Sequence, residues 1–401
     1  MISTFAALKY RNYSLVWLSS WLEHGGQFME TAALLWLVNE MTGSPFLLTL
    51  VGFCRLIPMV FISFIGGIVA DRVDRRNLLT LSLLGVILLS LSLAILVHTG
   101  LVTMTHIIIL ALLSGVVTSF NHPARQSIMP NLVPKESLMN AITLDSGSVT
   151  ISRLIGMPIA GYIILMAGVT PVFGLRAAGA LLAIVCLLLA RIPPTPPHAR
   201  KESPWRNLAE GLSYLRGSTI ILPLASLFLL PIFSMQSYTN LLPIFAVDVL
   251  KIDASGYGLL QGAPGLGALI AIIVIASLRG FRHKGLLLLS VGMVLGLALI
   301  AFSGSEWLAL SLALLVIVGC MNGAFMALNT TLIQSAISDE VRGRVMSLRE
   351  VARGLGPVGA LLIGAIAEHS GAPFAVAIVG GICLAVCLVL IILMPRVRKL
   401  E

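Results

Sequence analysis

The chain has 401 residues, of which 58% are hydrophobic and only 11% are charged, and its mean hydropathy is +1.00. This composition excludes a soluble chain of two or three ordinary domains and is typical of membrane proteins. The formal net charge of +9 could indicate a nucleic-acid partner. The positions of the basic residues along the chain decide between that partner and membrane topology.

Long apolar runs recur from one end of the chain to the other. Because about 20 apolar residues cross the hydrocarbon core as a helix, the sequence predicts an all-α membrane protein of twelve transmembrane helices. In chain order the predicted spans cover residues 13–38, 46–70, 78–98, 104–122, 138–165, 171–190, 219–245, 257–278, 285–303, 306–328, 345–367 and 373–394.

The first span carries an unusual number of polar side chains. Glu23, Gln27 and Glu30 follow one another at intervals of four and three residues, so they share one face of a helix, and His24 lies beside them. A charge at the bilayer centre costs about 2.5–3.5 kcal/mol on insertion scales, so each carboxylate should pair with another charge or face water. We expect this stripe to border a polar cavity, with His24 as a hydrogen-bonding wall residue.

Two alternatives remain for the acids within the spans. Either a carboxyl group exchanges a proton, with Glu23 preferred, Glu30 second and Asp145 of span five a further candidate, or a glutamate stays ionised in a fixed pair with Arg55 or Arg153. Arg55, midway along span two, is either such a counter-ion or a grip for an anionic substrate. Asp145 and Arg153 are eight positions apart, about 80° around a helix, so they do not share a tight stripe.

A short charged turn joins the second and third spans. Small residues before it allow close helix packing, and its basic residues mark the cytoplasmic side. The segment from Gly66 to Asn77 resembles the loop signature of the major facilitator superfamily, Gly-x-x-x-Asp-Arg-x-Gly-Arg-Arg, with Asp74 in place of the usual second glycine. The matching residues are Gly67, Asp71, Arg72, Arg75 and Arg76.

This resemblance implies two pseudo-symmetric six-helix bundles in which the first, fourth, seventh and tenth helices line a central pathway. It also implies that Asp71 and the loop arginines latch the cytoplasmic side near the start of span eleven. Arg344, Glu350 and Arg353 are the expected partners there, Glu350 and Arg353 as a structural gate. Arg176 of span six is expected to extend toward the membrane interface.

The chain divides into two halves. Residues 191–218 open with a proline-rich run and continue as an amphipathic pattern, which predicts a cytoplasmic linker between domains 1–190 and 219–401. Arg153-Leu-Ile-Gly156-Met-Pro158 in span five recurs weakly as Arg353-Gly-Leu-Gly356-Pro357 in span eleven, about 200 residues later, as expected for a duplicated half.

The second half offers further polar candidates for the substrate cavity. Each could bind substrate or hold helices together. They are Gln236, Tyr238 and Asn240 of span seven, Gln261 of span eight, and Asn322 and Asn329 of span ten.

The basic residues are distributed unequally across the predicted topology. With the N-terminus inside, twenty of the 26 Lys and Arg residues fall in cytoplasmic segments, five lie within spans, and Lys251 lies in an outside loop. Positive-inside asymmetry therefore explains the net charge, and nucleic acid is not an expected partner. We expect a multi-pass protein of a bacterial inner membrane with both termini in the cytoplasm.

Within the superfamily, Pro123-Ala124-Arg125-Gln126 and Val341-Arg342-Gly343-Arg344 resemble the enterobactin-exporter and macrolide-efflux branch. The resemblance implies alternating-access efflux of a small amphiphilic molecule, a drug or a siderophore-like metabolite, by proton antiport. The alternative is an importer, uniporter or lysolipid flippase without proton coupling. The expected protein is a monomeric transporter rather than an enzyme, with no cofactor and no metal.

Overall fold

A computed structural model of the chain describes residues 6–70, 74–192, 221–277, 283–337, 339–394 and 398. Within these ranges it describes the side chains except at 60, 61, 63–70, 122, 123, 126, 127, 130, 276, 277 and 339–353. Most of the predicted linker, from 193 to 218 with its amphipathic pattern, lies outside the described residues. Every regular element in the described ranges is a helix.

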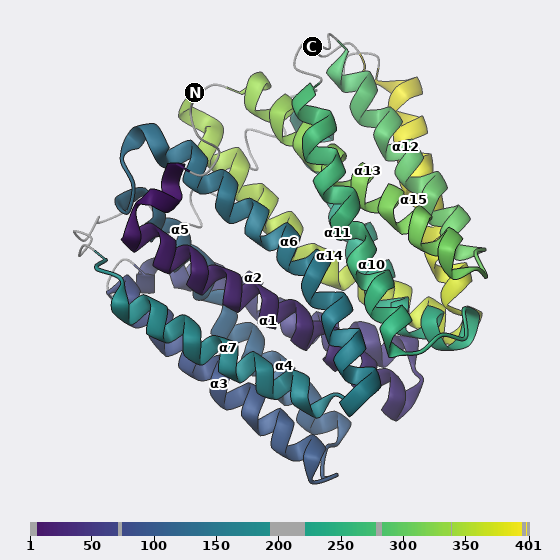
Figure 1. Cartoon of the computed structure of the whole chain (residues 1–401). Helices are drawn as coiled ribbons and strands as arrows, with labels where there is room; N and C mark the ends of the chain where they lie inside the picture. Colours follow the sequence, from purple (N-terminus) through teal and green to yellow (C-terminus); the bar gives the residue numbers. More distant parts are fainter. Residues whose placement is uncertain are drawn as a thin grey trace. The chain divides into compact units, whose positions relative to one another are not determined.

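Within each half the helices follow one another with short connections (Figure 1). The first half contains η1 (Ala6–Lys9), α1 (Arg11–Thr42), α2 (Pro45–Ala70), α3 (Arg75–His98), α4 (Met104–Ser119), α5 (Asn121–Ile128), η2 (Met129–Asn131), α6 (Lys135–Ala167) and α7 (Thr170–Leu189). The second contains α9 (Ile221–Ser226), α10 (Leu229–Ile244), η3 (Phe245–Val249), α11 (Ala254–Ser277), α12 (Lys284–Ser303), α13 (Leu308–Ala336), α14 (Asp339–Ser370) and α15 (Ala372–Leu393).

Each predicted span corresponds to helix in the structure. The predicted and observed helices differ only at the ends of spans and at prolines. Eight helical segments of the described residues are long and apolar enough to cross a membrane, and the apolar stretches of α2 and α4 are shorter. Span four, predicted as 104–122, is instead two helices, because Pro123 has no N–H to donate to the Ser119 carbonyl. Span ten, predicted to end at 328, continues to Ala336, because polar residues can extend a helix beyond its apolar part.

The contacts group the chain into two compact units. The first unit comprises residues 1–40 and 54–199, and the second comprises 41–53 and 200–401, so α2 contributes residues to both. Glu368 of α14 anchors the beginning of α2 within the second unit, because its Oε2 accepts hydrogen bonds from Ser44 Oγ at 2.7 Å and Phe46 N at 3.0 Å. The domain boundaries expected from the sequence stay a prediction.

Corresponding helices pair in the same way inside each unit. In the first unit, α3 lies against α7, and in the second unit α12 lies against α15 (Figure 1). These are the third and sixth spans of each half. Each unit contains a cluster of buried apolar side chains, one mainly on α1, α3, α5 and α7 and the other on α9, α10, α12, α13 and α15.

A glycine facing a proline-containing helix also recurs in both units. Gly115 of α4 faces Pro58 and the carbonyl of Arg55 on α2, and Gly319 of α13 faces the backbone of Pro264 on α11. In each case a Cβ in place of the glycine hydrogen would collide with the neighbouring backbone. The second and fourth spans of each half therefore cross at a glycine, which supports the repeat read from the sequence.

Gly319→Ala should therefore destabilise the second unit. The added methyl group has no room against Pro264, and overpacking of this kind costs about 1–3 kcal/mol. Gly381→Ala on α15 is the matched control, because a Cβ there has no neighbour within 4 Å. Thermal unfolding followed by size-exclusion chromatography should show a lower melting temperature for Gly319→Ala only. Equal shifts for the two variants would contradict the close crossing.

Candidate functional site

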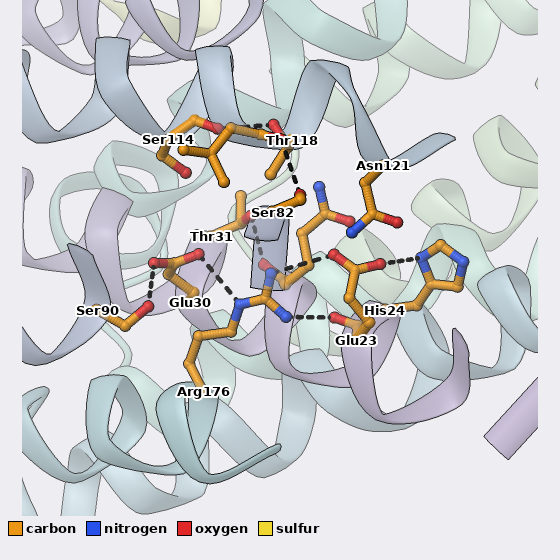
Figure 2. A network of polar contacts seen from close by, with 12 residues as sticks. Glu23, His24, Glu30, Thr31, Ser82, Ser90, Ser114, Thr118, Asn121 and Arg176 are labelled. Carbon is orange, nitrogen blue, oxygen red and sulfur yellow. Dashed lines mark hydrogen bonds and ion pairs between the residues drawn. The ribbon is translucent and has the colours of Figure 1, made fainter. Parts of the chain in front are cut away.

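A network of buried charges lies inside the first unit (Figure 2). Its acids are Glu23 and Glu30 on α1, which are 3% and 7% exposed. Its central base is Arg176 on α7, which is 1% exposed. Because buried charges are stable only beside opposite charge and hydrogen-bond partners, the contacts of Arg176 organise the site.

Arg176 binds both glutamates of the α1 stripe. Its Nη1 donates to the backbone carbonyl of Glu23 at 2.6 Å, and its Nη2 donates to Glu23 Oε1 at 3.2 Å. Its Nε lies 3.6 Å from Glu30 Oε2. Gly26, between the two acids, provides the space, since a Cβ there would lie 2.9 Å from Arg176 Cδ. The expectation that Arg176 extends to the membrane interface is wrong, because its charge is compensated internally instead.

Glu30 has a second basic partner and a hydroxyl donor. Arg55 Nη2 lies 3.3 Å from Glu30 Oε2, and Arg55 Nη1 donates to Thr31 Oγ1 at 2.8 Å. Ser90 Oγ of α3 donates to Glu30 Oε1 at 3.1 Å, and Figure 2 shows this contact. The basic partners of the two glutamates are thus Arg176, Arg55 and His24. Arg55 occupies the counter-ion position that the sequence offered as one alternative.

Glu30 and Arg55 also border a small cavity, which distinguishes Glu30 from Glu23. The other walls come from α1, α3 and α4 and are mostly leucine and isoleucine, with Ser114 adding a hydroxyl group. The cavity has room for about one water molecule, so a water-sized proton carrier can approach this carboxylate more readily than one enclosed by side chains. The arrangement supplies charge, hydrogen-bond donors and adjoining space at a single point.

His24 and Arg125 extend the network along α1. His24 Nδ1 lies 3.6 Å from Glu23 Oε2, so it lies beside the acid as expected for a wall residue. Arg125 of α5 is 5% exposed and donates to Asn121 Oδ1 at 2.7 Å, Ser20 Oγ at 2.7 Å and Ser19 Oγ at 3.4 Å.

The sequence does not identify Arg125 as a site residue, because the predicted span four ends at residue 122 and leaves Arg125 in a cytoplasmic connection. The structure instead continues as α5, whose Arg125 lies against α1. A signal was present in the two consecutive serines of an otherwise apolar part of span one, because such hydroxyl groups need a polar neighbour.

The other predicted residues of the first half occupy less central positions. Gln27 is partly exposed, and its backbone carbonyl accepts a hydrogen bond from Thr31 Oγ1 at 2.7 Å. Asp145 on α6 is partly exposed and acts electrostatically on both His24 and Arg125, so it belongs to the surroundings of the network. Arg153, also on α6, is 8% exposed.

In the second unit, Gln261 compensates for a proline. Pro243 of α10 has no N–H to donate to the carbonyl of Thr239, four residues earlier. Gln261 Nε2 of α11 donates to that carbonyl at 3.2 Å and lies 3.0 Å from Tyr257 Oη. Its position therefore joins α10 to α11 through a backbone group that the helix leaves free.

The remaining candidates of the second unit are mostly enclosed. Asn322 Nδ2 donates to the Pro231 carbonyl at 2.9 Å, a contact between α13 and α10. Tyr238 and Asn240 are 1% and 6% exposed, and Gln236 is partly exposed. Asn329 is fully enclosed, and its amide atoms have no hydrogen-bond partner in the described part of the chain. A substrate-binding role for these residues stays a prediction.

The predicted latch is described only in part. Asp71 and Arg72 lie outside the described residues, and so do the side chains of Arg344, Glu350 and Arg353 and all but the helical backbone of Gly67 in α2.

At the start of α3, Asp74 caps the helix by accepting from Arg76 N at 2.8 Å and Asn77 N at 3.2 Å, which gives the residue that replaces glycine a role. Arg76 Nη2 also donates to the Leu188 carbonyl at the end of α7, at 2.6 Å. Arg75 is the first residue of α3.

Comparison with protein families identifies one that covers nearly the whole chain. A sequence profile of the family described as transmembrane secretion effector matches residues 2–401. The staphyloferrin A transporter of Staphylococcus aureus is 26% identical over 357 residues, which are 88% of this chain and 89% of that protein. The enterobactin exporter EntS of Escherichia coli is 28% identical over 334 residues, which are 80% of this chain and 79% of that protein.

Solved structures show the same fold. A POT family transporter in complex with 5-aminolevulinic acid matches with a TM-score of 0.78 at 13% identity and covers 97% of both chains. The nucleoside transporter NupG matches with a TM-score of 0.73 at 15% identity and covers 97% of this chain and 100% of its own. Twelve membrane helices in the major facilitator arrangement, as expected from the sequence, are confirmed by these matches.

Breaking the central ion pair should reveal how strongly its members depend on each other. Arg176→Gln leaves two buried carboxylates with less positive charge, and loss of one partner of a buried pair costs about 3–5 kcal/mol. In the double variant Arg176→Gln/Glu23→Gln, one of the uncompensated charges is also removed. We therefore expect it to be more stable than the sum of the single effects predicts.

Thermal unfolding of the four members of this double-mutant cycle provides the measurement. Lys9→Gln, which alters an exposed basic residue, serves as the control and should leave the melting temperature nearly unchanged. Strict additivity of the two substitutions would mean that Glu23 and Arg176 do not stabilise each other.

Proposed function

Because the chain belongs to the transmembrane secretion effector family of the major facilitator superfamily, we propose that it exports a small amphiphilic molecule by alternating access. A siderophore-like metabolite is the preferred cargo, and a drug is the second choice. Among the relatives, one is named for staphyloferrin A transport and another for enterobactin export, and each matches four fifths or more of the chain. Their names support the cargo class without fixing the molecule.

The observation that carries this proposal is the buried charge network of the first unit. Three arginines and two glutamates meet there on α1, α2, α5 and α7, far more charge than a helix bundle needs to hold together. The guanidinium group of arginine binds carboxylate and other anionic oxygens. Chelating molecules such as siderophores carry several such oxygens. The glutamates can exchange protons with a passage that opens to one side at a time.

Proton antiport is the finer part of the proposal, and Glu30 is its preferred carrier. Glu23 was favoured from the sequence, but it is held by Arg176 through both its carboxylate and its backbone. Glu30 borders the cavity and contacts Arg55, Arg176 and Ser90. Protonation of Glu30 would remove the charge that Arg55 contacts and leave Arg176 bonded to Glu23, so Glu30 is the acid that can exchange a proton with the smaller loss of pairing.

The proposed orientation places both termini in the cytoplasm of a bacterium, with the turn between α2 and α3 on the cytoplasmic side. The unequal distribution of basic residues supports this orientation. In the proposed cycle, Asp71 and the neighbouring arginines hold that side closed near the start of α14 until the cargo binds. The Asp74 cap and the Arg76 contact keep the beginning of α3 in position for this role.

Export can be measured with purified protein in liposomes loaded with enterobactin or staphyloferrin A. A proton gradient directed opposite to cargo flow should accelerate efflux. Glu30→Gln should reduce the rate to that seen without a gradient, because a glutamine cannot carry the proton. Glu306→Gln is the matched control, since Glu306 is exposed between α12 and α13.

A Glu23→Gln variant distinguishes the two acids. If Glu23 is a static partner of Arg176, its variant should lower stability while the response to the gradient remains. Efflux that ignores the gradient in the wild-type protein would remove the antiport proposal. It would favour the alternative of an uncoupled facilitator or lysolipid flippase, for which the fixed Glu23–Arg176 pair is the supporting observation.

A further inference from the structure

We propose that Asn121 and Arg125 of α5 form a recognition site for a carboxylate group of the transported molecule. The inference rests on the proposed export function, because it assigns a chemical class to the cargo. It concerns the α5 end of the network described above, where Arg125 has no ion pair with Glu23 or Glu30 among the described residues. Three observations support it: the contacts of Arg125, an unused donor on Asn121, and the break between α4 and α5.

Arg125 is buried without a carboxylate in contact. Its three hydrogen bonds go to neutral oxygens, those of Asn121, Ser20 and Ser19. Within the described residues no carboxylate oxygen lies within 4.0 Å of its guanidinium group, whereas Arg55 and Arg176 have one at 3.3 and 3.2 Å. Glu23 and Asp145 act on Arg125 electrostatically but only from beyond contact distance. A buried charge is ordinarily paired by direct contact, so the position beside Arg125 is suited to an anion that comes from outside the chain.

Asn121 contributes a donor that has no acceptor. Its Oδ1 accepts from Arg125 Nε at 2.7 Å, and this bond identifies which end of the amide is the NH2 group. Its Nδ2 is buried and has no hydrogen-bond partner among the described residues, and the residue is only 4% exposed. Unpaired buried donors are rare because they lose their hydration without replacement. An anionic acceptor would therefore complete the contacts of both the Arg125 guanidinium group and the Asn121 amide.

The site lies where a membrane helix is interrupted. The helix α4 ends at Ser119 and α5 begins at Asn121, because Pro123 cannot donate to the Ser119 carbonyl. Interrupted helices in transporters commonly carry ligand-binding groups, since their polar groups can be satisfied by the ligand. The bond from Arg125 to Ser19 is the longest of the three at 3.4 Å, so it is the one that a carboxylate would replace most easily.

The test uses purified full-length protein, with citrate as the carboxylate probe and its neutral trimethyl ester as the matched compound. Citrate should raise the melting temperature and the ester should not. In Asn121→Asp, a carboxylate of the same shape takes the place of the unused NH2 group and supplies the missing counter-ion. This variant should therefore melt at a higher temperature without citrate and bind citrate about 10- to 100-fold more weakly.

Asn121→Leu and Lys135→Gln complete the set. The leucine variant removes the donor without adding charge, so it should weaken citrate binding without raising the melting temperature. The exposed Lys135 lies at the start of α6, and its variant should bind citrate as the wild type does. The proposal is overturned if the wild type binds citrate no better than the ester, if Asn121→Asp leaves citrate affinity unchanged, or if it lowers the melting temperature.

Binding measured in this way needs no transport, so the two proposals can fail separately. Liposomes that show no efflux, together with citrate binding that Asn121→Asp weakens as expected, would refute export and support the carboxylate site. Normal efflux in liposomes with citrate binding unaffected by Asn121→Asp would refute the carboxylate site and leave export standing.

Discussion

Carboxylates within a helix that crosses lipid persist only where positive charge reaches them. The hydrocarbon offers no water to replace lost hydration, so the choice of partner is set by how neighbouring helices pack. In this protein the partner of Glu23 is Arg176, from a helix more than 150 positions further along the chain. This contact ties α7 to α1 inside the first unit.

Other features of the first unit follow from the same constraint. Gly26 is small because the guanidinium group of Arg176 passes beside it. Ser90 and Thr31 provide hydroxyl groups at the points where Glu30 and Arg55 would otherwise lack a hydrogen-bond partner. An elaborate polar network of this kind restricts sequence variation, because loss of one member leaves the others buried and unsatisfied.

The sequence predicted the helices well because span length depends mainly on the thickness of the bilayer. The apolar runs were long enough to be recognised, and the spacing of Glu23, Gln27 and Glu30 correctly marked one face of α1. Helix ends were less predictable, since α13 continues through polar residues and Pro123 divides span four. Those ends depend on single hydrogen bonds rather than on the membrane.

The partners of the charges could not be predicted from spacing alone. Arg176 was expected at the interface because it lies near the start of its span, yet packing of α7 on α1 buries it. Arg125 was assigned to a connection because the apolar run had ended. Which residues meet across helices depends on rotation and depth, and these are set by close contacts such as that at Gly26.

The shared helix α2 has a mechanical consequence. Its first residues are held by Glu368 in one unit, and its later residues, beginning with Cys54, belong to the other. Pro58 lies four residues after Cys54 and leaves that carbonyl without its usual intrahelical donor. The point where α2 bends most easily thus lies next to the boundary between the two units. Bending there breaks no hydrogen bond to the Cys54 carbonyl, because Pro58 already leaves that carbonyl without an intrahelical donor.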